Sequence, residues 1–320
     1  MIFKNSQYGS WSDPKAQGAQ AAIQYAATAW GNMLVSNIEI KIETYWENLS
    51  VKHDSSFLNT LAYARASKLY TLTSNDPNST NFTNTYYPIA LVEKITGNNE
   101  NQNESEIIMS FNSLKPWSFS LDKTQVQGKY DMVTITMHEI AHGLGFVSSA
   151  KEDSVTKVLS HSVMFPFIFD QFVEFGSNKK LTSIASTGSG TTTWLTSNNS
   201  FFNGPEVKLK NNTRPEIFCP FTWVQGSSMS HFNENYFIGS DKNALMTPYT
   251  NVTEIHHDPG EVGLAVLIDI GWVGAVLPVE EFPYYSNDVI KIFPNPASAN
   301  IKIRVENGIE ISELRMLNIE

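Results

Sequence analysis

The chain has 320 residues, of which 41% are hydrophobic and 17% are charged, so its composition is that of a globular protein and not a disordered one. The formal net charge is −10, and no lysine and arginine cluster is present to attract nucleic acid or an anionic membrane. A single cysteine, Cys219, excludes an intramolecular disulfide framework. No stretch reaches transmembrane length, and the first residues lack an apolar signal core, so we expect any export signal upstream of them.

The first predicted elements are a helix over residues 14–35 and a strand over residues 38–43. Pro14 suits a first helical turn, and apolar residues from Ala22 to Leu34 recur on one side at helical spacing. Residues 38–43 alternate between apolar and charged side chains, which is typical of a half-buried strand. A helix followed so closely by a strand indicates an α+β fold, in which a helix packs on a mixed sheet.

Residues 75–85 are rich in Asn, Asp, Ser and Thr, which indicates a surface loop. Their oxygen atoms could bind a structural calcium ion, but no spaced acidic ligand set supports that site, so a solvated loop is the better interpretation. A short helix over residues 87–95 and a strand over residues 106–112 are predicted next.

The most informative stretch is residues 136–146, which contains the sequence His-Glu-Ile-Ala-His. Residues four apart lie on the same face of a helix, so His138 and His142 can direct both imidazoles at one metal ion. Glu139 lies beside that face and can act on a metal-bound water without displacing it. This H-E-x-x-H arrangement is typical of zinc peptidases, which take two ligands and a general base from five residues. The alternative is an amphipathic helix with two histidines at its polar edge.

Gly145 follows His142 by three residues and permits the left-handed conformation that ends a helix and returns the chain beneath the metal. The extended metzincin motif H-E-x-x-H-x-x-G-x-x-H continues with a third histidine, but this chain has Ser148 at that position. A serine hydroxyl is a poor zinc ligand. Either the site is degenerate or its third ligand lies farther along the chain.

Residues 150–225 are predicted to be an inserted segment that precedes the third ligand. Its aromatic block, residues 165–175, is interpreted as core packing for the insertion. Residues 186–200 are polar and rich in Gly, Ser and Thr, which indicates a loop. Cys219 is interpreted as a small buried apolar side chain.

His231 and Met246 form the second informative region. A histidine followed by a methionine in a turn that Pro248 closes is similar to the metzincin order of third ligand and underlying methionine. The remaining histidines do not fit that order because they lie too early in the chain or after the methionine: His53, His161, His256 and His257.

Taken together, these motifs resemble the leishmanolysin family of metzincins, in which the third histidine also follows an insertion. The resemblance is carried by His138-Glu139-x-x-His142-x-x-Gly145-Phe146, Ser230-His231-Phe232 and Leu245-Met246-x-Pro248. It covers about residues 15–275 and ends with residues 260–272, which resemble the closing helix of such domains. Leishmanolysins are rich in disulfides and often have tryptophan where this chain has Phe232, so the chain is placed as a bacterial relative and not as a close member.

The resemblance implies a secreted zinc endopeptidase over residues 1–275, with a mixed sheet, an active-site helix and a methionine turn. The implied zinc ligands are His138, His142 and His231. Glu139 would be the general base acting on a zinc-activated water, and Met246 would support the site without binding the metal. Tyr249 is a candidate oxyanion stabiliser. We expect a monomer with a protein or peptide substrate, and the strand over residues 106–112 would pair at its edge with an extended peptide.

Two alternatives remain open. A non-catalytic extracellular adhesion module that retains the peptidase fold is favoured by Ser148 and disfavoured by the intact Glu139. A zinc peptidase of the gluzincin type, with Glu174 as third ligand, is disfavoured because Gly145 and Met246 would have no role in it.

Residues 276–288 contain two prolines and an acidic pair, which is typical of a linker. Residues 289–320 then alternate as strands do, and Phe293-Pro294-Asn295-Pro296 resembles the start of the C-terminal sorting domain of type IX secretion cargo in Bacteroidota. The resemblance implies a partial β-sandwich sorting domain that contacts the secretion machinery and delivers the protein outside the cell or to its surface. An ordinary β-domain fragment is the alternative.

Overall fold

The computed structural model describes residues 1–72, 82–102, 104–124, 126–153, 155–156, 159–161, 163–183, 194–252, 254–274, 290–293 and 302–305. The chain divides into two compact units, Met1–Ala275 and Val276–Glu320. The first unit combines helices with small mixed sheets, which agrees with the coarse prediction of a mixed fold. No helix in the described ranges is long and apolar enough to cross a membrane.

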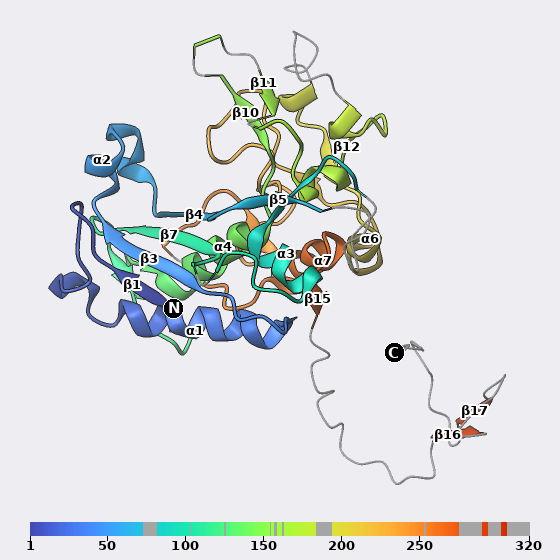
Figure 1. Cartoon of the computed structure of the whole chain (residues 1–320), viewed down its shortest axis with the longest axis horizontal. Coiled ribbons are helices and arrows are strands. Elements are labelled where there is room, and N and C mark those ends of the chain that lie inside the picture. The colour runs from blue at the N-terminus through green and yellow to red at the C-terminus, as the bar shows by residue number, and fades with distance from the viewer. Residues whose placement is uncertain are drawn as a thin grey trace. The chain divides into compact units, whose positions relative to one another are not determined.

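The four-stranded sheet of the first unit has the order β1-β3-β7-β4 (Figure 1). Strands β1 (Ile2–Lys4), β3 (Ile42–Glu47) and β7 (Ile107–Asn112) are parallel, and β4 (Ala62–Ala66) pairs antiparallel with β7. The predicted strand over residues 106–112 is therefore present, but it is internal. The prediction that a peptide pairs with its edge is wrong, because β3 and β4 occupy both of its sides.

The predicted helix over residues 14–35 is interrupted at Gly18, which has a φ of 93°. Pro14 begins only a short 3-10 turn, η1 (Pro14–Ala16), and the helix proper is α1 (Ala19–Met33). The predicted strand over residues 38–43 begins later, at Ile42, which pairs with Ile107, the first residue of β7.

The predicted helix over residues 87–95 is α3 (Ile89–Thr96). It begins after Pro88 because Tyr86–Pro88 form β6, which pairs with β5 (Leu69–Thr71). The predicted loop over residues 75–85, with its candidate calcium ligands, lies mostly outside the described residues.

The segment over residues 150–225 contains short elements, of which β12, β13 and β14 form an antiparallel sheet. The elements are β10 (Ala150–Glu152), β11 (Leu159–His161), η3 (Ile168–Phe172), β12 (Val173–Phe175), η4 (Leu181–Ser183), β13 (Ser200–Phe202), α6 (Pro205–Asn211) and β14 (Glu216–Ile217). The aromatic block packs into the core as predicted, with Phe169 and Phe175 fully buried. Cys219 is also buried, as expected, whereas much of the predicted loop over residues 186–200 lies outside the described residues.

The remaining elements are short except for α7, which agrees with the predicted closing helix. They are β2 (Leu34–Val35), α2 (Leu49–Lys52), η2 (Ser55–Asn59), β8 (Trp117–Ser118), β9 (Tyr130–Asp131), η5 (Ala244–Met246), α7 (Gly260–Asp269) and β15 (Val273–Gly274). In the second unit, β16 (Ile290–Phe293) pairs antiparallel with β17 (Lys302–Val305). A sorting role for this unit stays a prediction.

Helix α4 (Met132–Leu144) carries the H-E-x-x-H motif and is buried at every residue except His142. It packs against α1 on one side and against β4 and β7 on another (Figure 1). Asp131 begins the helix, since its Oδ1 accepts hydrogen bonds from the Thr134 backbone amide and hydroxyl, both at 2.7 Å. Gly145 ends it with a φ of 116°, as the sequence predicted.

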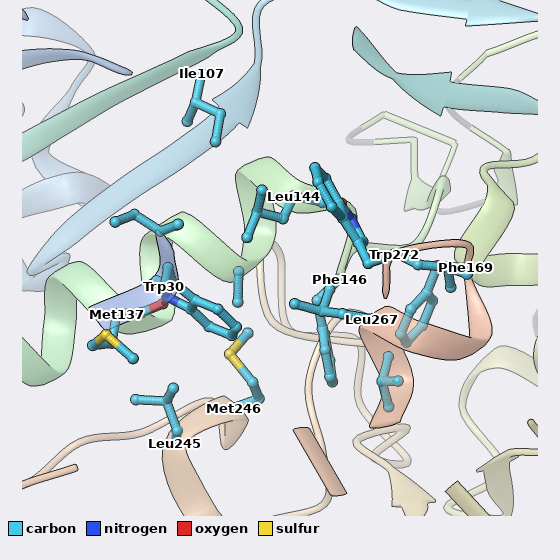
Figure 2. Packing of buried hydrophobic residues seen from close by; sticks show 14 of the residues in the cluster. Trp30, Ile107, Met137, Leu144, Phe146, Phe169, Leu245, Met246, Leu267 and Trp272 are labelled. Carbon is cyan, nitrogen blue, oxygen red and sulfur yellow. Dashed lines mark hydrogen bonds between the residues drawn. The ribbon is translucent and has the colours of Figure 1, made fainter. Parts of the chain in front are cut away.

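Two buried tryptophans connect α4 to distant parts of the chain. Trp30 of α1 donates its indole N–H to the Met137 carbonyl at 3.0 Å, and Trp272 donates to the Leu144 carbonyl at 2.9 Å. Figure 2 shows both indoles beside the helix. A Trp buried in this way fills the core and still satisfies its polar N–H, so α4 is fixed at two of its turns.

Gly143 allows α4 to approach β7 closely. A Cβ atom at this position would lie 2.5 Å from Ile107 Cγ2, which is far inside van der Waals contact. Gly31 of α1 offers a matched comparison, because a Cβ atom there would have no neighbour within 4 Å.

We expect Gly143→Ala to lower the free energy of unfolding by about 1–3 kcal/mol, because the added methyl overpacks the contact with Ile107. Gly31→Ala should instead raise it by about 0.5–1 kcal/mol, since alanine is the better helix former. Chemical denaturation of the two variants beside the parent measures both effects. Equal changes in the two variants would contradict the close approach of α4 to β7.

We expect a chain that ends at Ala275 to unfold in one cooperative transition at the Tm of the full chain, because Met1–Ala275 is a compact unit. Thermal unfolding followed by circular dichroism measures this. A broad or lowered transition in the shortened chain would show that Val276–Glu320 contributes to the core.

Candidate metal centre

Three histidine side chains from two distant segments meet beside α4. The Nε2 atoms of His138 and His142 are 3.0 Å apart, and the Nε2 of His231 lies 3.1 Å and 3.2 Å from them. Within the described ranges, this is the group of His, Cys, Asp or Glu side chains that could hold a metal ion. The prediction that His231 joins the two helix histidines therefore agrees with the geometry.

A backbone carbonyl orients each of the three rings by accepting a hydrogen bond from its Nδ1. The acceptors are Leu245 O for His138 at 2.7 Å, Phe146 O for His142 at 2.7 Å and Ser227 O for His231 at 2.9 Å. Since a carbonyl oxygen only accepts, each Nδ1 carries the proton. Each neutral ring therefore directs the lone pair of its Nε2 toward the other two.

The three lone pairs cannot hydrogen-bond to one another, because none of the Nε2 atoms carries a proton. Nitrogen ligands of a tetrahedral zinc ion with Zn–N bonds of 2.0–2.1 Å lie about 3.3 Å apart. The observed separations of 3.0–3.2 Å are close to that value and are best understood as ligand–ligand distances. The donor set thus fits one divalent cation that prefers imidazole nitrogen.

Burial lowers the pKa of His138 to about 4 and the pKa of His142 to about 3. Burial, with the neighbouring rings, also lowers the pKa of His231 well below its usual value. All three rings are therefore neutral at neutral pH, which is the state in which histidine binds a metal. His142 is the least buried of the three, so the cluster opens toward solvent on its side.

Glu139 lies in the turn of α4 between the two helix histidines and is 6% exposed. Burial raises the pKa of its carboxyl to about 8, and the backbone amide of Ala64 acts in the opposite direction. A cation on the adjacent histidines would lower that pKa toward neutrality. Ala64 belongs to β4, so the carboxyl lies beside an edge strand of the sheet and is suited to proton transfer there.

The position of His231 depends on two neighbouring segments. Its carbonyl accepts from the Phe218 amide at 2.8 Å, just after β14, and the next residue, Phe232, donates to the Met246 carbonyl at 2.9 Å. Met246 is fully buried, and the residue before it, Leu245, orients His138. The sequence singled out Met246 but missed this carbonyl, because a backbone contact has no residue-type signal.

Ser148 occupies the position at which the extended metzincin motif has its third histidine. It forms hydrogen bonds within the protein and is not part of the histidine cluster. Its hydroxyl donates to Asp170 Oδ1 at 2.6 Å, and its backbone amide donates to the Ser230 hydroxyl at 3.1 Å. Asp170 is fully buried and also accepts from the amides of Ser149 at 3.0 Å and Phe167 at 2.9 Å. Asp170 therefore joins the turn after α4 to the insertion. The sequence analysis missed it, although an acidic residue inside an aromatic block is unusual.

Glu174 is the third ligand in the gluzincin alternative, and the structure contradicts that assignment. It lies in β12, where Arg214 Nη1 is 3.2 Å from its Oε2, and it is not a member of the histidine cluster. Tyr249 is half exposed, and its ring packs edge-on against Phe218 with centroids 5.8 Å apart. No contact found among the described residues joins Tyr249 to the three histidines, so its catalytic role stays a prediction.

The side chain of His161 is not described, and three of the other histidines have contacts away from the cluster. His53 stacks on Phe57, with ring centroids 4.3 Å apart. His257 Nε2 lies 2.9 Å from Asp131 Oδ1 and supports the start of α4. Neither His256 nor His257 belongs to the cluster, as the sequence predicted.

A cleft of about 790 Å³ borders the N-terminal turn of α4. Its charged and histidine lining residues are Lys123, Lys242, Glu254, His256, His257 and Asp258. The His256 backbone amide donates to the Thr134 hydroxyl at 2.7 Å, and Thr134 precedes His138 by one helical turn. The cleft wall is thus continuous with the helix that carries the histidines.

A family model described as SPBPB7E8-like matches residues 10–175, which is just over half of the chain. The chain belongs to the SPBPB7E8-like family. The matched residues include His138, Glu139 and His142 but end before His231 and Met246. No curated protein and no solved structure matches the chain. The SPBPB7E8-like description names no activity.

We expect His231→Ala to weaken Zn²⁺ or Co²⁺ binding severely, because two imidazoles on one helix surround only one side of an ion. His256→Ala is the matched control and should bind metal as the parent does, since the hydrogen bond of His256 to α4 comes from its backbone amide, which the substitution keeps. Isothermal titration of the metal-stripped proteins measures both. Parent-like affinity in His231→Ala would remove His231 from the ligand set. His257→Ala is a poor control, because its loss also weakens the start of α4.

Proposed function

We propose that this SPBPB7E8-like protein is a zinc-dependent endopeptidase of the metzincin type. The observation that carries the proposal is the convergence of three neutral Nε2 lone pairs beside the buried carboxyl of Glu139. Three histidines leave one position of a tetrahedral zinc ion free, which is the composition of a catalytic site and not of a closed structural one.

His138, His142 and His231 would hold the zinc ion through their Nε2 atoms. Zinc in such a site acidifies water and polarises a carbonyl group. The Glu139 carboxyl would accept a proton from the attacking water and transfer it to the nitrogen of the leaving amine. Its buried position excludes competing solvent.

An extended peptide substrate would pair with the edge strand β4, because β7, the strand expected from the sequence to bind it, is internal. Within the described residues, β4 pairs only with β7, so its other edge can accept an extended peptide by main-chain hydrogen bonds. Ala64 of this strand lies beside Glu139, so a peptide bound along β4 would pass the proposed base. This position favours a peptide or protein substrate over a small ester or sugar.

Three further features support a metzincin type of site. Gly145 turns the chain in a left-handed conformation directly after the helix, and the third histidine follows an insertion. The turn at Met246 is buried and orients His138 through the Leu245 carbonyl. The adhesion alternative, which Ser148 favoured, stays open, but His231 offers the third nitrogen that Ser148 does not. Secretion through the type IX pathway is a further proposal, which rests on the resemblance of residues 289–320.

We expect Glu139→Ala to retain about one equivalent of zinc and to hydrolyse unfolded protein about 10² to 10⁴ times more slowly than the parent, because it lacks the base. Glu104→Ala, which removes an exposed carboxyl that pairs with Lys68, is the control and should keep parent activity. Metal analysis and a casein-type cleavage assay measure the two properties. Parent-like cleavage by Glu139→Ala would refute the mechanism.

A further inference from the structure

The cleft of about 790 Å³ beside the first turn of α4 is lined by residues that the proposed zinc site does not use. A cavity of this volume lies within the range of ligand-binding pockets. Its titratable lining groups have both signs of charge: the carboxylates of Glu254 and Asp258 and the ammonium groups of Lys123 and Lys242. The kind of ligand therefore depends on which of these groups dominates inside the cleft.

Negative charge dominates at the histidine wall of the cleft. Three carboxylates act on the ring of His256, which lines the cleft: those of Glu254, Asp241 and Asp131. The charge of Glu254 also acts on the neighbouring Glu234. A concave surface with low-dielectric walls focuses a field of one sign. The inside of the cleft therefore favours a cation.

The two lysines oppose this field only weakly. Both are exposed, so water and salt screen their charges, whereas Glu254 is half-buried. Lys242 Nζ also lies 3.4 Å from Glu261 Oε1, a carboxylate that offsets its charge.

Two ring nitrogens of the histidine wall have no hydrogen-bond partner among the described residues: His256 Nε2 and His257 Nδ1. The His256 ring donates from its other nitrogen to the Gly239 carbonyl, and His257 Nε2 lies 2.9 Å from Asp131 Oδ1. Because these oxygens only accept, a neutral ring carries its proton on that side and keeps a lone pair on the unpartnered nitrogen. Burial lowers the pKa of His256, so that ring is neutral at neutral pH. The lone pairs add to the negative potential of the wall.

Hydrogen bonds hold both lining carboxylates in place. Glu254 Oε1 accepts from Asn251 Nδ2 at 2.8 Å, and Asp258 Oδ1 accepts from the Gly260 amide at 2.7 Å. The second oxygen of each carboxylate has no donor among the described residues and can accept from a ligand. Carboxylates fixed in this way lose little conformational freedom when they bind a cation.

We propose that this cleft binds the guanidinium group of an arginine side chain from a peptide or protein, with the carboxylates of Glu254 and Asp258 as its acceptors. A guanidinium group directs five N–H donors outward in one plane, so it can bond to two separate carboxylates. A lysine ammonium group fits less well, because it is a compact point charge that is more strongly hydrated.

An arginine in the cleft would place its peptide beside the histidine cluster. The His256 amide donates to the Thr134 hydroxyl at 2.7 Å, so the cleft wall contacts α4 at Thr134. Thr134 and His138 are four residues apart and share one face of the helix, about 6 Å apart along its axis. A preference for arginine-containing substrates would follow, and that consequence rests on the proposed peptidase function. The binding of arginine itself does not.

The test is isothermal titration of the full chain, loaded with one equivalent of zinc, with N-acetyl-argininamide. Both ends of this probe are uncharged, so only its guanidinium group carries charge. We expect a Kd on the order of 1 mM, in keeping with the size of the probe, and a higher Kd at high salt. N-acetyl-citrullinamide has the same shape without the charge and should bind about tenfold more weakly. Equal binding of the two probes, or tighter binding of sulfate, overturns the proposal. No cleavage is measured, so the result is independent of the peptidase function.

Glu254→Gln locates the probe in the cleft. It keeps the shape of the side chain but removes its charge, and it should raise the Kd of N-acetyl-argininamide about fivefold to tenfold. Glu104→Gln is the matched control, because it removes an exposed carboxylate that pairs with Lys68 and should leave the Kd unchanged. An unchanged Kd in Glu254→Gln would place the probe elsewhere and overturn the proposal.

Lys242→Gln provides an independent test, which also applies if Glu254→Gln fails to fold. The pair of Lys242 with Glu261 is exposed, so its loss should have little effect on stability. Removing this cation makes the field of the cleft more negative and should lower the Kd of N-acetyl-argininamide about twofold. An unchanged or higher Kd would show that the cleft does not attract cations and would contradict the proposal.

Discussion

Three imidazole lone pairs that face one another at 3.0–3.2 Å are the constraint on which the surrounding structure depends. Each ring is oriented by a main-chain carbonyl, and the three carbonyls come from different places: the turn after α4, the segment before His231 and η5. The cluster forms only when all three backbone segments are correctly positioned together. Because backbone oxygens accept these hydrogen bonds, the side chains of the three accepting residues are free to pack elsewhere. The side chain of Leu245, for example, is buried in the core.

The inserted segment over residues 150–225 helps to position the histidine cluster. When a third ligand follows the helix after three residues, a short turn delivers it; here the chain folds a small sheet before it reaches His231. Asp170 binds the turn after α4 to the insertion, and Ser230 accepts from that same turn. The contacts of Phe218 and Phe232 then hold His231 between β14 and the methionine turn. Mispacking in the insertion would therefore displace His231 without any change to the helix that carries His138 and His142.

Features that depend on local spacing could be predicted from the sequence. The helix with His138 and His142, its end at Gly145 and the closing helix were of this kind, and the place of His231 followed from the order of motifs. Features that depend on pairing between distant segments could not. Whether residues 106–112 are internal or at an edge depends on β4, which is a distant part of the sequence. The carbonyl oxygens that accept from the three histidines, and the carboxylate of Asp170, correspond to no periodic pattern in the sequence. Only the folded chain identifies them.

The histidine cluster also affects the stability of the fold. It buries three Nε2 lone pairs that have no proton between them. Buried polar atoms without a partner lower the stability of a folded chain. An ion that bound these atoms only in the folded chain would therefore raise the free energy of unfolding. Helix α4, which carries two of the three rings, packs on Ile107 of β7 at Gly143. Since a typical domain is stable by only about 5–15 kcal/mol, the free energy gained at this one cluster would be a substantial part of the stability of the layer formed by α4 and β7.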